Sequence, residues 1–148
     1  MAAAVAAALL GAVAAGQVAA AAGMPVGEHL YGGRVAEADG RLPVPYRAAS
    51  GSAAVLLGAL ALLLLARVGL VRAPGVPTRL LTTGTWAVVV LMAVNTLGNL
   101  ASTSAVERWG LGSLTALVSV LAAVAARSPL PAATPASRRP RTGAVSGG

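Results

Sequence analysis

Residues 50–71 read SGSAAVLLGALALLLLARVGLV and form the most apolar segment of the chain. A helix that spans a membrane needs about 20 predominantly apolar residues, and this segment meets that length. Its one charged side chain, Arg67, lies one turn before the end, where a guanidinium can extend to the membrane interface. The segment therefore predicts a transmembrane helix over residues 50–71.

The composition of the whole chain favours the same environment. Of its 148 residues, 57% are hydrophobic and 10% are charged, whereas soluble domains carry about 25% charged residues. The absence of cysteine excludes disulfides and cysteine-ligated metals. The net charge of +7 comes from arginine alone, but two Trp and two Tyr provide little base-stacking surface, so nucleic acid is not an expected partner.

Three more apolar segments complete the expected fold. Residues 2–23 are alanine-rich and uncharged, and residues 81–102 and 111–126 supply a third and a fourth helix. We prefer an uncleaved first helix to a signal peptide, because the first basic residue is Arg34 and the apolar run exceeds the usual length of about 7–15 residues. The sequence predicts an all-α, four-helix transmembrane bundle over residues 1–127.

The connecting segment at residues 24–49 is rich in glycine and proline, which excludes a long helix there. Asp39-Gly40 is a turn signal between two short runs, so we expect a β-hairpin-like loop. Tyr31 and Tyr46 would lie at headgroup depth. Residues 128–148, rich in arginine and proline, predict a disordered tail.

The distribution of arginine predicts the orientation in the membrane. With four helices, the termini and the loop at residues 73–80 share a side that has seven arginines, against four on the loop side. The side richer in basic residues is usually cytoplasmic. We expect both termini in the cytoplasm of a bacterial cell, with the bundle in its inner membrane.

Polar side chains interrupt the third predicted helix. Asn95, Asn99 and Ser102 share one helical face. They are interpreted either as interhelical hydrogen-bonding groups or as the polar lining of a ligand or ion path. We favour the first interpretation, since Gly98 would let a neighbouring backbone approach closely.

Glu107 and Arg108 follow directly, on the same side as the predicted hairpin. We expect the hairpin to fold back over this end of the bundle and to bring Arg34, Arg41 or Arg47 toward Glu107. Any functional site is expected beneath that loop.

No pattern of catalytic, cofactor-binding or metal-ligating residues is recognisable. His29 is the only histidine, no HExxH spacing occurs, and one histidine cannot build a zinc site alone. His29 could handle protons near neutral pH, but a loop histidine without a role is the simpler reading. We therefore expect no enzymatic activity and no cofactor.

Several short motifs resemble those of an uncharacterised family of small four-helix bacterial integral membrane proteins. The motifs are YGGR at residues 31–34, LP at 42–43, RAAS at 47–50 and NTLGN at 95–99, followed by Ser102, Ser104, Glu107 and Arg108. The resemblance runs from about Pro25 to Arg127. Tyr31 stands at the position before the glycine pair, where we associate tryptophan with the family. It implies a multi-pass membrane protein with a glycine-rich exterior loop and assigns no activity.

The expected function is a structural or accessory one, with the lipid bilayer and other membrane proteins or a second copy as partners. A small transporter or channel subunit is the alternative, and a membrane enzyme is a third class. Proton-coupled exporters usually carry an acidic residue inside a helix, whereas all four acids here lie in expected loops.

Overall fold

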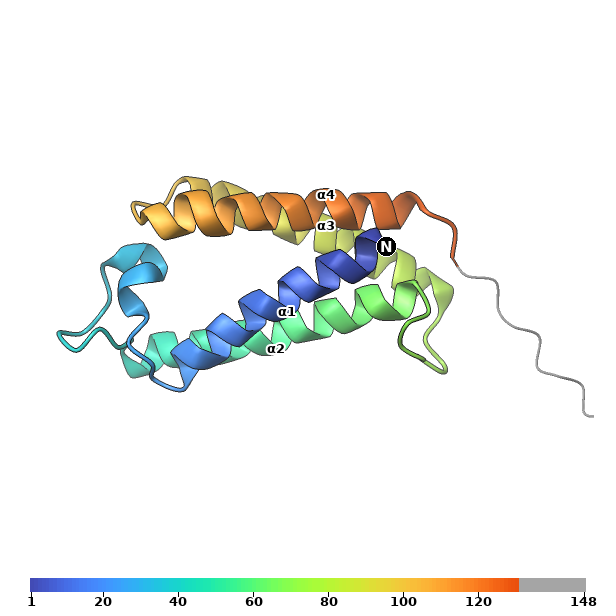
Figure 1. Cartoon of the computed structure of the whole chain (residues 1–148). Coiled ribbons are helices and arrows are strands. Elements are labelled where there is room, and N and C mark those ends of the chain that lie inside the picture. The colour runs from blue at the N-terminus through green and yellow to red at the C-terminus, as the bar shows by residue number, and fades with distance from the viewer. Residues whose placement is uncertain (131–148) are drawn as a thin grey trace, which may run out of the picture.

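The computed structural model describes residues 1–130, and all of the regular secondary structure in this range is helical (Figure 1). The four long helices are α1 (Ala2–Ala21), α2 (Val44–Arg67), α3 (Thr78–Leu100) and α4 (Gly112–Arg127). Shorter helical turns are η1 (Gly27–His29), η2 (Tyr31–Gly33) and η3 (Val106–Leu111). Four helices are long and apolar enough to cross a membrane, the last counted from Val106 to Arg127. The chain is therefore a multi-pass membrane protein, as predicted.

The helix bounds agree with the prediction to within four residues except at one end. Helix α2 begins at Val44, six residues before the predicted start at Ser50. Pro43 caps this helix and Pro45 lies in its first turn. Proline is tolerated there because the first N–H groups of a helix have no intrahelical partner, so excluding a helix from residues 44–49 on account of proline was wrong.

The predicted β-hairpin is also wrong, because the described residues contain no strand. The segment between α1 and α2 folds as η1 and η2, followed by a turn in which the Gly40 N–H donates to the Glu37 carbonyl at 2.9 Å. Gly32, Gly33 and Gly40 have positive φ, so the chain reverses repeatedly and never extends far enough to pair. Only the turn at Asp39-Gly40 is as predicted. We call residues 22–43 the connecting loop.

The helices form two pairs, α1 with α2 and α3 with α4, which converge at the end that holds the N-terminus (Figure 1). The buried core lies mainly at this end. On α1 it consists of Ala3, Ala6, Ala7 and Leu10, which recur at helical spacing and pack against Leu64, Val88, Met92, Val118, Ala122 and Ala125. Because alanine is small, α1 can approach its neighbours closely.

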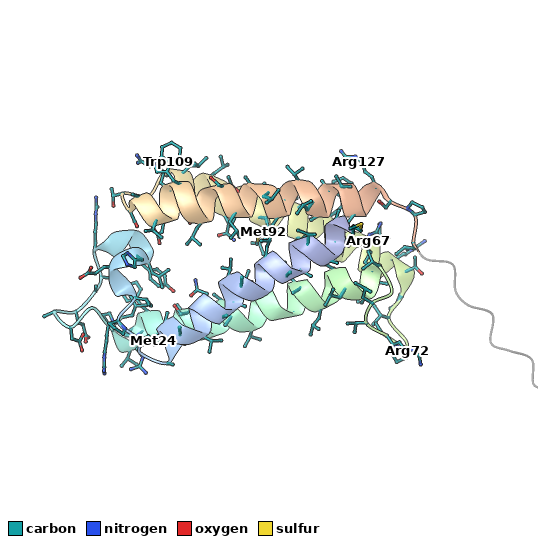
Figure 2. The ribbon with its side chains drawn as sticks, viewed as in Figure 1. Met24, Arg67, Arg72, Met92, Trp109 and Arg127 are labelled. Carbon is teal, nitrogen blue, oxygen red and sulfur yellow. The ribbon has the colours of Figure 1, made fainter. Side chains whose placement is uncertain are left out.

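The two ends of the bundle differ in charge. We call the end with Met1 the arginine end, since Arg67, Arg72, Arg79 and Arg127 lie there and no acidic side chain does (Figure 2). The opposite, loop end holds the connecting loop and the acids Glu28, Glu37, Asp39 and Glu107. The predicted tail lies outside the described residues from residue 131 onward.

Arg67 is not freely exposed at the end of α2, as a side chain that extends into solvent would be. Its side chain is 4% exposed and turns inward to the C-terminus of α4. The guanidinium donates to the carbonyl oxygens of Ala125, Ala126 and Ser128, each at 2.9 Å. The last carbonyls of a helix lack intrahelical donors, and the helix dipole attracts a cation there. Arg67 therefore joins the end of α2 to the end of α4.

Candidate functional site

The connecting loop is attached to the end of α3 through Glu107. The Gly32 N–H donates to Glu107 Oε2 at 2.9 Å, and the Ser102 hydroxyl donates to the same oxygen. Thr103 Oγ1 in turn donates to the Gly32 carbonyl at 3.3 Å. The prediction that the loop folds back over this end of the bundle and meets Glu107 is confirmed.

The predicted charge partners of Glu107 are wrong. Within residues 1–130 the one salt bridge joins Arg41 and Asp39 at 3.4 Å, with both side chains more than half exposed. Exposed pairs of this kind contribute little to stability. Glu107 instead accepts from a backbone amide and a hydroxyl, which can approach a part-buried carboxylate without the cost of burying a second charge.

Arg47, one of the predicted partners of Glu107, and the candidate residue Arg108 each cap a helix. Arg47 Nε donates to the carbonyl of Ala21, the last residue of α1, at 3.1 Å. Arg108 Nε donates to the carbonyl of Leu100, the last residue of α3, also at 3.1 Å. Arg34 is exposed and makes no side-chain hydrogen bond to the described part of the chain. Arg34 and Arg47 therefore do not pair with Glu107 as we predicted.

Tyr31 fixes the loop to α2. Its hydroxyl lies 3.1 Å from Ser50 Oγ, and its ring meets that of Tyr46 edge to face at a centroid distance of 5.0 Å. Tyr31 has a φ of 52°, which is uncommon outside glycine. A residue persists in this conformation when its surroundings determine it strongly, as these two contacts do.

Asn95 and Asn99 do not make the interhelical hydrogen bonds that we predicted. The side-chain bonds between α3 and α4 come from Thr96, whose hydroxyl donates to Thr115 at 2.9 Å, and from Ser119, which donates to the Val89 carbonyl at 3.0 Å. Nothing lies within 4 Å of a Cβ placed on Gly98, so the close helix approach expected there is absent from the described structure.

Asn95 and Asn99 line a cavity of about 320 Å³ between the helix pairs. Gln17 of α1 and Thr115 of α4 contribute to the same lining, with apolar walls from Leu56, Leu57, Leu91 and Leu114. Gln17 Oε1 is buried and has no hydrogen-bond partner among residues 1–130. Sequence reasoning missed Gln17, although it is the only polar side chain in α1 and could have been found on that ground.

A second cavity, of about 340 Å³, lies next to the first and is lined by the connecting loop. Val26, His29 and Leu30 of the loop and Val106 of η3 form part of its lining. Val13, Gln17, Leu111 and Leu114 belong to both cavities. We call the two together the loop-end recess. His29 is part of its lining. The recess lies under the loop, where a site was predicted.

The chemistry of the recess suits an uncharged molecule. The first cavity has no charged side chain in its lining, and its polar groups are three carboxamides and one hydroxyl. Carboxamides offer both donors and acceptors without the desolvation cost of an ion. Residues 1–130 contain no group of three potential metal ligands from His, Cys, Asp or Glu.

No family model, curated protein or solved structure matches the chain. The resemblance to the family of small bacterial membrane proteins therefore stays a prediction. The fold by itself defines the class: a four-helix, multi-pass membrane protein with a recess beneath its longest loop.

Proposed function

We propose that this is a non-enzymatic accessory protein of the membrane whose loop-end recess binds one uncharged, largely apolar molecule. The observation that carries the proposal is Gln17 Oε1, a buried acceptor without a partner in residues 1–130, in a cavity that Asn95 and Asn99 also line. A buried, unsatisfied acceptor costs about 1–3 kcal/mol. A ligand that donates a hydrogen bond to Gln17 removes this cost.

The size and lining of the recess support this ligand class. The two cavities measure about 320 and 340 Å³, which falls within the range of about 300–1,000 Å³ for small-molecule pockets. Most of their lining is aliphatic, so the body of the ligand is apolar, as in a neutral lipid. The polar part is a group that hydrogen-bonds a carboxamide, such as a hydroxyl.

The proposed orientation places the arginine end in the cytoplasm of a bacterial cell. The seven arginines expected on this side, against four at the loop end, support it. The recess and the connecting loop would then face the exterior half of the membrane. A C-terminal reporter enzyme that is active only in the cytoplasm should be active, and a reporter active only outside the cell would reverse this orientation.

The ligand can be sought by mass spectrometry of protein purified from its native membranes in a mild detergent. We expect about one uncharged amphiphile per chain, the occupancy of a single site. Leu114→Trp fills the recess from a position that lines both cavities, and it should abolish this occupancy.

The matched control is Leu117→Trp, three residues along α4 on a side chain that is 49% exposed. It adds the same bulk outside the recess and should retain the molecule. Equal occupancy in the two variants, or wild-type protein that carries no such molecule, would refute the proposed function.

A further inference from the structure

The arginine end contains a buried positive charge with no acidic partner. Arg67 is 4% exposed, and all four acidic side chains of the chain lie at the loop end. Buried charges are usually paired, and the carbonyl oxygens that Arg67 contacts are dipoles that offset only part of its charge. The guanidinium therefore keeps an attraction for an anion.

A cavity gives such an anion access. It measures about 260 Å³ and lies between the ends of α2 and α3, with Arg67, Arg72 and Thr78 in its lining. Thr78 is the first residue of α3, and no side chain caps this helix start. The N–H groups of Leu80 and Leu81 donate to the Pro77 carbonyl, whereas those of Thr78 and Arg79 have no partner among residues 1–130. Free N–H groups at a helix start favour an anion.

An apolar cavity of about 290 Å³ adjoins this basic cavity. Ala66, Val71, Ala73 and Leu81 belong to both. The apolar cavity continues between α2 and α3, where Leu62 and Leu63 of α2, Leu80 of α3 and Val76 of their connection line it. A basic cavity at the helix ends therefore leads directly into an apolar groove within the membrane-spanning part of the bundle.

We infer that the arginine end binds an anionic phospholipid at a specific site. Its phosphate lies beside Arg67 and Arg72 at the start of α3, and an acyl chain occupies the groove between α2 and α3. A free phosphate would fill only the basic cavity, and a zwitterionic lipid would bring a second positive charge to an end that has no acid. The joined cavities thus favour a lipid that has both an anionic headgroup and an acyl chain. This site is separate from the loop-end recess.

Arg127 offers a matched control at the same end. Its guanidinium lies 5.4 Å from the centre of the Trp86 ring and does not line the basic cavity. Figure 2 shows Arg72 on the α2–α3 connection and Arg127 at the end of α4. Arg127→Gln and Arg72→Gln therefore remove the same charge from the same membrane surface, but only Arg72→Gln removes it from the cavity.

The test is lipid binding by the intact protein in detergent, measured by native mass spectrometry and by thermal melting. We expect phosphatidylglycerol to bind one per chain and to raise the melting temperature, with phosphatidylcholine and inorganic phosphate much weaker. Arg72→Gln should weaken phosphatidylglycerol binding about fivefold, the effect of one arginine near headgroups, and Arg127→Gln should leave it within about twofold.

Ala73→Trp tests the groove independently of charge. Ala73 lies in the α2–α3 connection and lines both cavities, so a large side chain there closes the junction between headgroup and chain. It should abolish specific binding while every arginine remains. Three results would overturn the inference: equal binding of the two lipids, equal losses in the two arginine variants, or full stabilisation by inorganic phosphate alone.

Discussion

Three arginines bind the ends of three helices. Arg47 contacts the end of α1, Arg108 the end of α3 and Arg67 the end of α4. In a membrane the last carbonyl groups of a helix have little water to bond, so a donor supplied by another segment is worth more than on a soluble protein. Arginine suits this role because its planar fork reaches several carbonyls at once.

Arg67→Lys tests this role at the most buried position. Lysine keeps the charge but cannot reproduce the fork that spans Ala125, Ala126 and Ser128. We expect a loss of about 2 kcal/mol in the free energy of unfolding, since hydrogen bonds to charged groups contribute about 1.5–3 kcal/mol each. Thermal or denaturant unfolding in detergent measures it. Arg127→Lys, on a side chain stacked over Trp86, is the control, and an equal loss there would contradict the capping role.

Gln17→Met separates stability from binding at the recess. Methionine has a similar shape, and it removes the buried Oε1 that lacks a partner in residues 1–130. Ligand-free protein should gain up to about 1 kcal/mol of stability, whereas the amount of co-purified molecule should fall. Unfolding of delipidated protein and mass spectrometry give the two readings. A loss of stability together with unchanged occupancy would mean that Gln17 is a structural residue only.

At the scale of elements, the connecting loop and the end of α3 form one unit through Glu107. Its carboxylate accepts from Gly32 and Ser102, so the loop, α3 and η3 meet at one oxygen atom. Such a contact needs no second charged side chain, and it joins segments that are far apart in the sequence. It also fixes to this end of the bundle the loop whose residues Val26, His29 and Leu30 line the second cavity.

Glu107→Ala should therefore loosen the loop without unfolding the helices. The Gly32 amide and the Ser102 hydroxyl lose their acceptor, at a cost of about 2 kcal/mol. Hydrogen exchange should rise in η1 and η2 and stay unchanged in the buried half of α3. Glu37→Ala, on an exposed side chain of the same loop, should change neither. If the rate of hydrogen exchange in the loop were the same in both variants, this would argue against docking through Glu107.

The sequence predicts the helices well because each lies in a long, predominantly apolar run, a signal that follows from the thickness of the bilayer. The start of α2 is missed because proline is read as a helix breaker, although it is acceptable in a first turn. The position of the loop could be predicted because residues 95–107 become more polar toward the end of the bundle at which the loop lies. The partner of Glu107 could not be predicted, since a backbone amide such as that of Gly32 leaves no mark in the sequence.

For a different reason, the sequence could not decide between the two interpretations of Asn95 and Asn99, of which we favoured interhelical hydrogen bonding over the lining of a ligand path. Helix α1 is apolar on every side, so its sequence does not reveal which face packs against the bundle. The divergence of the two helix pairs toward the loop end, and with it the cavity, depends on this packing (Figure 1). Only Gln17 distinguishes one face of α1, and whether that face lines a cavity depends on the position of α3.

At the scale of the molecule, the bundle has two differently built halves. Small residues of α1 close the arginine end tightly, and the buried core lies there. At the loop end the helix pairs separate around a recess that the loop lines. A closely packed half thus adjoins a half in which the helix pairs diverge, and the proposed ligand would occupy the space between them.

The most direct test of this account is photo-crosslinking in native membranes at Leu114. A photoreactive amino acid there lies in the recess, and the same amino acid at Leu117 faces outward as a control. The account predicts that position 114 captures one defined, uncharged molecule, identified from the added mass, while position 117 captures the mixed lipids of the bilayer. The same lipid mixture at both positions, or crosslinking to protein alone at position 114, would contradict it.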